Sequence, residues 1–187
     1  MRIVDLSMTV DECDSTPFAP EEAYFKVRPI VRWEDKGFVS NIVELTVHAG
    51  THIDSPHHFV RSAGGVETLP LDALIGDAIV LDLTAKGKAN ARIGPDDLDA
   101  AEQALIARRP RVLGFDFAQE EKGADYQTAG EILTSGMRVH RIILPKIVYQ
   151  IENLINLDQI PSKVKIVALP VKWKTESAPA RVIAILD

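Results

Sequence analysis

Four of the five histidines fall within one short segment that also contains an aspartate. The segment is His48-Ala49-Gly50-Thr51-His52-Ile53-Asp54-Ser55-Pro56-His57-His58. Imidazole and carboxylate together are ligands for Zn, Mn, Fe or Ni. Clustered imidazoles repel one another when protonated, but are stable together when they are neutral and bound to a cation. The segment therefore predicts a metal centre.

The spacing within the segment indicates which side chains share one side of the chain. In an extended run, His52 and Asp54 point the same way because they are two residues apart. His48 lies four residues before His52, and Gly50 between them allows the chain to fold back. The same spacing occurs in helical zinc sites, but Gly50 and Pro56 disfavour a helix. We therefore expect a site carried by a loop.

The adjacent pair His57 and His58 would point to opposite sides of an extended chain, so only one of them can easily face the metal. One histidine should remain free for proton transfer. His48 ends a stretch, residues 41–48, in which apolar and polar side chains alternate, which predicts a strand with His48 at the end of its polar face.

The rest of the chain predicts more strands than helices. Strand-like runs cover residues 3–6, 24–31, 41–48, 77–83, 111–116, 148–154, 164–169 and 182–186, and we expect the run at 77–83 to be buried. Helices are expected near residues 94–109, where Pro95 occupies the first turn, and near 140–144. We predict an α+β, or mixed α/β, fold in one domain over residues 1–187.

Composition narrows the classes of partner. The net charge of −6 disfavours general binding to nucleic acid or to an anionic membrane. No run approaches the ~20 apolar residues needed to cross a bilayer, and the N-terminal residues lack a signal-peptide pattern. Cys13 is the only cysteine and lies among carboxylates, which disfavour a reactive thiolate. We expect a cytoplasmic protein with a small-molecule substrate.

The histidine segment resembles the signature of the cyclase, or kynurenine-formamidase-type, family of metal-dependent hydrolases. That signature is His-x-Gly-Thr-His-x-Asp-x-Pro-x-His, and every fixed position is present here. Further similarity covers residues 5–7, 140–144, 151–154, 169–172 and 178–184, and so extends over most of the chain.

The resemblance implies roles for individual residues. His48, His52 and Asp54 would bind a metal ion, and Asp54 could bridge to a second ion held by His140 and Glu152. His58 would transfer protons.

The resemblance also implies a swivelling β/β/α fold, one or two Zn or Mn ions per chain, and a homodimer or homotetramer. Aryl formamides and cyclic amides such as isatin are the substrates it implies. We expect metal-activated water to cleave an amide-type C–N bond, with His58 as general acid and base. Ser55 or His57 would orient the reacting groups, and Thr51 would support a ligand.

Some segments depart from the family pattern. Residues 8–23 lack the expected aromatic and glycine residues, residues 114–117 read Gly-Phe-Asp-Phe, and Glu176-Ser177 replaces a common Asp-Gly. Two alternatives remain open. One is a divergent member that binds metal and a small ligand without hydrolysis. The other is a non-haem iron oxygenase built on His52, Asp54 and His140, although that triad leaves His48, His58 and Glu152 without a role.

Overall fold

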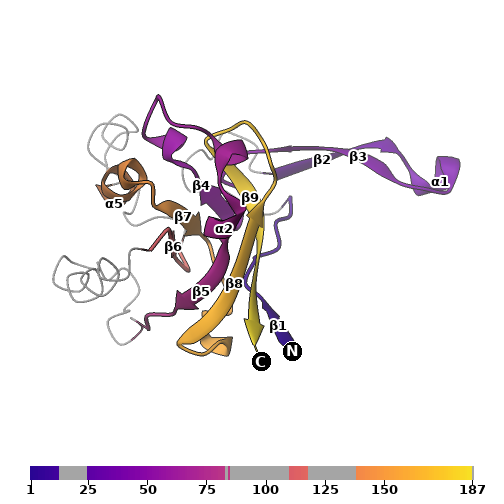
Figure 1. Ribbon diagram of the computed structural model, residues 1–187. Helices are drawn as coiled ribbons and strands as arrows, with labels where there is room; N and C mark the ends of the chain where they lie inside the picture. The colour runs from indigo at the N-terminus through magenta and orange to yellow at the C-terminus, as the bar shows by residue number, and fades with distance from the viewer. Residues whose placement is uncertain (13–24, 83, 85–109, 118–137, 187) are drawn as a thin grey trace.

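The computed structural model describes residues 1–12, 25–82, 84, 110–117 and 138–186. Seven strands of this described part form one curled sheet in the order β5-β8-β9-β4-β7-β6, and β1 pairs with β9 (Figure 1). These strands are β1 (Arg2–Asp5), β4 (His52–Asp54), β5 (Ile75–Ile79), β6 (Val112–Gly114), β7 (Tyr149–Glu152), β8 (Lys163–Pro170) and β9 (Ser177–Leu186). All pair antiparallel except β6 and β7, which are parallel.

Strand β9 organises the sheet because it pairs with β1, β8 and β4 along its length. Its sequence alternates small or β-branched residues on a buried face, and Ala178, Val182 and Ala184 are fully buried. Leu6 and Ile53 join them in the hydrophobic core. This core fixes the position of β4, the three-residue strand that carries His52 and Asp54.

The helices described are few and short, and confirm the predicted mixed α/β class. They are α1 (Trp33–Lys36), α2 (Leu71–Leu74) and α5 (Arg138–Ile143), with 3₁₀ turns at Pro56–His58, Val66–Thr68, Leu144–Lys146 and Leu157–Gln159. The helix expected near 140–144 is thus present as α5. The helix expected at 94–109 and Cys13 lie outside the described residues. No described helix is long and apolar enough to cross a membrane.

Strands β2 (Phe25–Val31) and β3 (Ser40–Leu45) form a separate hairpin, with α1 between them, that extends away from the main sheet (Figure 1). The strand predicted at 41–48 was therefore too long, since β3 ends at Leu45 and His48 lies in the turn that follows. The alternation predicted an inner apolar face, but Val43 is 48% exposed. Among the described strands, β2 and β3 pair only with each other, so the alternating pattern of β3 does not place its apolar side chains against the main sheet.

The strand predicted at 77–83 was also misplaced. Strand β5 spans Ile75–Ile79, and most of its residues are exposed rather than buried. Within the described part of the chain, it lies at the edge of the sheet and pairs only with β8. An edge strand can carry an apolar run without being covered on both faces. Local periodicity therefore does not distinguish a buried central strand from an exposed edge strand.

Candidate metal centre

Strand pairing brings four polar side chains to one face of the sheet. His52 lies directly opposite Glu152, and Asp54 directly opposite Gln150, in the antiparallel ladder of β4 and β7. Because opposite residues and residues two apart share a face, the four side chains form a compact patch. All four are buried. The site is thus carried by two central strands, which corrects the prediction of a loop.

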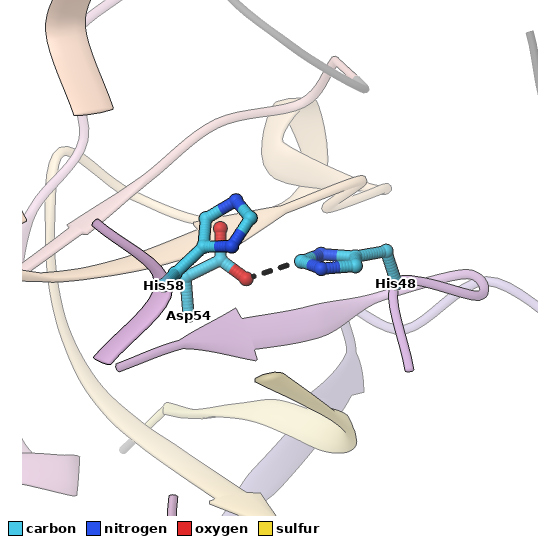
Figure 2. Close-up of side chains that lie close together, drawn as sticks. All are labelled: His48, Asp54 and His58. Carbon is cyan, nitrogen blue, oxygen red and sulfur yellow. Dashed lines mark ion pairs between the residues drawn. The ribbon is translucent and has the colours of Figure 1, made fainter. Parts of the chain in front are cut away.

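His48 and His58 approach this patch from outside the sheet. His48 lies in the turn after β3, and its Nδ1 is 3.3 Å from Asp54 Oδ1. His58 ends the 3₁₀ turn Pro56–His58, which follows β4. Figure 2 shows the His48 ring turned toward the Asp54 carboxylate, and the His58 ring lying beside the same carboxylate. The ring centroids of His48 and His58 are 4.8 Å apart.

His140 reaches the opposite side of the Asp54 carboxylate from α5. Its Nε2 lies 3.2 Å from Asp54 Oδ2 and 3.2 Å from Glu152 Oε1. The ring is almost completely buried. The structure therefore brings together all six predicted residues, namely His48, His52, Asp54, His58, His140 and Glu152. Because His48 and Glu152 belong to the same cluster, it exceeds the three ligands of an iron-oxygenase triad.

The orientation of the His52 ring is fixed by the backbone. Its Nδ1 lies 2.8 Å from the carbonyl oxygen of Gly50, which can only accept a hydrogen bond. Nδ1 is therefore the protonated nitrogen, and Nε2 presents a lone pair to the cluster. His52 Nε2 and Asp54 Oδ1 are buried without a hydrogen-bond partner among the described residues. Two such buried acceptors side by side are costly unless a cation satisfies both.

The distances within the cluster fit a divalent ion. Nitrogen and oxygen ligands lie about 2.0–2.2 Å from zinc, so neighbouring ligand atoms around one ion are about 3–3.5 Å apart. The measured separations range from 3.2 Å, for His140 Nε2 and Asp54 Oδ2, to 3.8 Å, for His52 Nε2 and Asp54 Oδ1. Glu152 Oε2 is 3.5 Å from His52 Nε2. The residues present therefore suit a metal with mixed nitrogen and oxygen ligands.

The carboxylates of the cluster are held in their ionised form. Burial alone would raise the pKa of Asp54, but its close contacts with the His140 and His48 rings bring that pKa well below its usual range. The pKa of Glu152 is lowered in the same way: burial opposes ionisation, while close contacts with the His140 and His52 rings outweigh it. Two carboxylates that stay charged inside the protein provide the negative charge that a cation requires.

The two outer histidines differ in protonation. Burial would lower the pKa of His48, but its contacts with Asp54 and Glu176 raise it to about 9. Burial lowers the pKa of His58 to about 4, because the charge of Asp54 compensates only in part. At neutral pH, His48 is thus protonated in the metal-free protein, while His58 is neutral.

Asn153 and Thr51 support the site through hydrogen bonds to the backbone next to His52 and Glu152. Asn153 Nδ2 donates to Gly50 O at 2.9 Å, the same oxygen that orients His52. Thr51 Oγ1 donates to Asn153 O at 2.5 Å and accepts a bond from the Met8 amide at 3.0 Å. The supporting role expected for Thr51 thus acts through the backbone. Asn153 was not predicted, although its place beside Glu152 was a signal.

The Ser55 hydroxyl bonds outside the cluster, although the Ser55 carbonyl accepts a hydrogen bond from the His58 amide at 3.1 Å. Ser55 is buried, and both its amide and its hydroxyl bond to the carbonyl of Glu176, which ties β4 to the start of β9. His57 is exposed, whereas its neighbour His58 is partly buried over the cluster. The expectation that only one of the two adjacent histidines faces the site agrees with this arrangement. Gln150, on the face shared with Glu152, was missed.

Comparisons with a family model and with known proteins agree on one family. A family model described as "Putative cyclase" matches residues 4–115, which is more than half of the chain. Kynurenine formamidase from Salinibacter ruber is 23% identical over 98% of this chain and 97% of its own length. Kynurenine formamidase from Geobacillus thermodenitrificans is 35% identical over 56% of this chain and 48% of its own length.

A solved structure of similar fold is isatin hydrolase A from Ralstonia solanacearum. It superposes with a TM-score of 0.78 at 21% identity, covering 98% of this chain and 91% of the other. This likeness confirms the predicted fold, and the sequence match identifies the family. The chain belongs to the cyclase family.

Proposed function

We propose that this protein is a metal-dependent hydrolase that cleaves an amide-type C–N bond in an aryl formamide or a cyclic amide. The observation that carries the proposal is a pair of buried acceptors, His52 Nε2 and Asp54 Oδ1, that receive no hydrogen bond among the described residues and lie beside ionised Glu152. The names of the relatives, kynurenine formamidase and isatin hydrolase, support the substrate class.

His48, His52 and Asp54 would hold the ion, with His140 and Glu152 on the far side of the Asp54 carboxylate. Zn and Mn both suit this set of nitrogen and oxygen ligands. When bound, such an ion supplies Lewis acidity, which polarises a carbonyl and brings the pKa of water from ~15.7 toward ~7.

His58 is the proposed proton-transfer residue. Its neutral ring can take a proton from the attacking water, because burial keeps it unprotonated at neutral pH. The water oxygen bonds to the carbonyl carbon, the C–N bond breaks, and His58 returns the proton to the leaving nitrogen. A formamide would give formate and an arylamine, and a cyclic amide would give a ring-opened amino acid.

We also propose that the protein is cytoplasmic and works as a homodimer or homotetramer. The hairpin of β2 and β3 supports assembly, because an isolated two-stranded hairpin is barely stable in water. Trp33, Phe38 and Val39 at its outer end are more than half exposed. Light scattering of the purified protein would test this assembly, and a monomer would contradict it.

The activity is tested with enzyme stripped by a chelator and then reloaded with Zn²⁺ or Mn²⁺. We expect reloaded enzyme to hydrolyse an N-formyl arylamine or isatin, and both stripped enzyme and the Asp54→Asn variant to be inactive. Metal binding without turnover on either class would instead favour the divergent member that binds without hydrolysis. Activity that survives complete removal of metal would contradict the proposal.

A further inference from the structure

The His58 ring is surrounded by three other aromatic rings. Its centroid lies 4.8 Å from that of His48, 4.7 Å from that of Phe59 and 5.7 Å from that of His140. Within the described part of the chain, neither ring nitrogen of His58 has a hydrogen-bond partner. Figure 2 shows this ring beside the Asp54 carboxylate. The direction in which its nitrogens point is therefore set by packing against the neighbouring rings.

Phe59 meets the His58 ring in an arrangement that aromatic pairs favour. The two ring planes are 87° apart, and perpendicular rings at this separation attract one another. The backbone on both sides of this contact is tied into the turn. The His58 amide donates to the Ser55 carbonyl and the Phe59 amide to the Pro56 carbonyl, each at 3.1 Å. Phe59 is thus placed to limit rotation of the His58 ring.

Helix α5 fixes the Phe59 ring in its turn. The guanidinium carbon of Arg141 lies 5.0 Å from the centre of the Phe59 ring, which is within the range of a cation–π attraction. The His140 ring, also on α5, is 5.5 Å from the Phe59 ring at a tilt of 41°. Phe59 therefore joins the turn that carries His58 to the helix that carries His140.

Resting on the proposed function, we propose that Phe59 is the positioning residue of His58. A histidine in an active site is usually oriented by a hydrogen bond from its second nitrogen to a carboxylate or carbonyl, as His52 is by the Gly50 carbonyl at 2.8 Å. For His58, the Phe59 ring replaces that bond, because it blocks rotation of the imidazole. Arg141 holds Phe59 in place, and Phe59 acts on the reaction only through His58.

The geometry makes the direction of the His58 ring decisive. A nitrogen of His58, a nitrogen of His48 and an oxygen of Asp54 lie within 4.8 Å of one another. A single water between these atoms is within reach of the His58 nitrogen, as proton transfer requires. A rotation of the ring moves that nitrogen out of reach, and a misplacement of about 1 Å can cost about 100-fold in rate.

The first test is kinetic and uses two variants of Phe59. Phe59→Leu keeps an apolar side chain but removes the ring, whereas Phe59→Tyr keeps the ring. We expect Phe59→Leu to lower kcat by about 10- to 100-fold, with KM and metal content unchanged. Phe59→Tyr should turn over at close to the natural rate. A rise in KM at unchanged kcat would instead make Phe59 a substrate contact and would overturn the proposal.

A double-mutant cycle asks whether Phe59 acts through His58. In the His58→Ala background no imidazole is left to orient, so Phe59→Leu should change kcat by no more than about twofold. An equal loss in both backgrounds would overturn the proposal. Arg141→Met should lower kcat by about two- to fivefold, the weight of one exposed cation–π pair. Lys146→Met is its control, since Lys146 is an exposed cation at the end of the next turn.

The orientation of the ring gives a test that does not depend on turnover. In crystals of Phe59→Leu, the His58 ring should turn away from Asp54 or take more than one orientation. A ring that keeps its natural orientation would contradict the role of Phe59. Should Phe59→Leu not fold, Phe59→Met is measured in the same way. No turnover of any N-formyl arylamine or isatin by the natural, metal-loaded protein would overturn the proposed function, while the crystals would still decide the role of Phe59.

Discussion

His52 and Glu152 are direct cross-strand partners in the ladder of β4 and β7, although a hundred residues separate them along the chain. Their side chains converge, with His52 Nε2 and Glu152 Oε2 3.5 Å apart. The candidate metal centre is therefore a property of this strand pairing. It follows that residues which hold the two strands in register determine the site as much as its ligands do.

Asp54 is the residue that contacts histidines on both sides of the cluster, His48 and His140, so Asp54→Asn should abolish metal retention. The amide is isosteric but neutral, and it places a donor where His48 and His140 now meet a carboxylate. We expect metal affinity to fall by at least about 100-fold, above the 10- to 100-fold typical of supporting residues. Titration of stripped protein measures this, and the exposed variant Asp72→Asn is the control. Unchanged affinity would refute the assignment of Asp54.

Metal binding should depend on pH through His48. Because its pKa is about 9 without metal, a cation must displace its proton at neutral pH. Apparent affinity should rise about tenfold per pH unit as pH increases toward 9, and then level off. Glu176→Gln removes one of the two carboxylates that raise this pKa, so the plateau should begin at lower pH. An affinity that does not change between pH 6 and 9 would show that His48 is not displaced.

The raised pKa of His48 should make the metal-free fold less stable as pH rises, whereas metal affinity increases over the same range. A pKa of about 9 in the folded protein, against 6.5 for an unperturbed histidine, stabilises the fold below pH 6.5. This contribution should be lost as pH rises through 9. Thermal unfolding of stripped protein across this range measures it. The decline should be smaller in Glu176→Gln, and an equal decline would argue against the His48–Glu176 contact.

His58 and His57 offer a matched pair for the proton-transfer role. His58→Ala should keep its metal but lose about 10²- to 10⁴-fold in kcat, the usual size of a proton-transfer contribution. His57→Ala should retain near-normal turnover, because His57 is exposed. Metal content and kcat are measured on the same preparations. Loss of metal from His58→Ala would instead make His58 a ligand.

Gly50 supports the site through its backbone. Its φ of +61° is left-handed, and an added Cβ would collide with the Val10 side chain. Gly50→Ala should therefore cost about 1–2 kcal/mol for the conformation and a further 1–3 kcal/mol for the collision. Gly37→Ala shares the positive φ but meets nothing within 4 Å, so it isolates the first cost. Equal melting temperatures for the two variants would contradict the packing argument.

The residues of the candidate site could be predicted from sequence because their chemistry is unusual and mostly local. Imidazoles and a carboxylate at the spacing of His48, His52 and Asp54 are rare enough to indicate a metal. His140 and Glu152 required the family resemblance, since nothing local places them near the segment. It is the pairing of β4 with β7 that does so.

Other features depended on tertiary structure. The run at 41–48 alternates as a core strand does, yet Val43 lies in a projecting hairpin. The sequence around Gln150 has no unusual local pattern. Its place in the cluster follows from its register opposite Asp54. Gly50 and Pro56 indicated a loop, but three residues between them, His52–Asp54, were enough for a strand once β7 and β9 lay on either side.

The most direct test of the central claim is anomalous diffraction from crystals of metal-loaded protein. The account predicts a peak within about 2.0–2.2 Å of His52 Nε2 and Asp54 Oδ1, the distance expected for nitrogen and oxygen ligands. No anomalous peak between these two atoms in crystals of active, fully loaded enzyme would contradict it, because the catalytic ion would then be bound elsewhere.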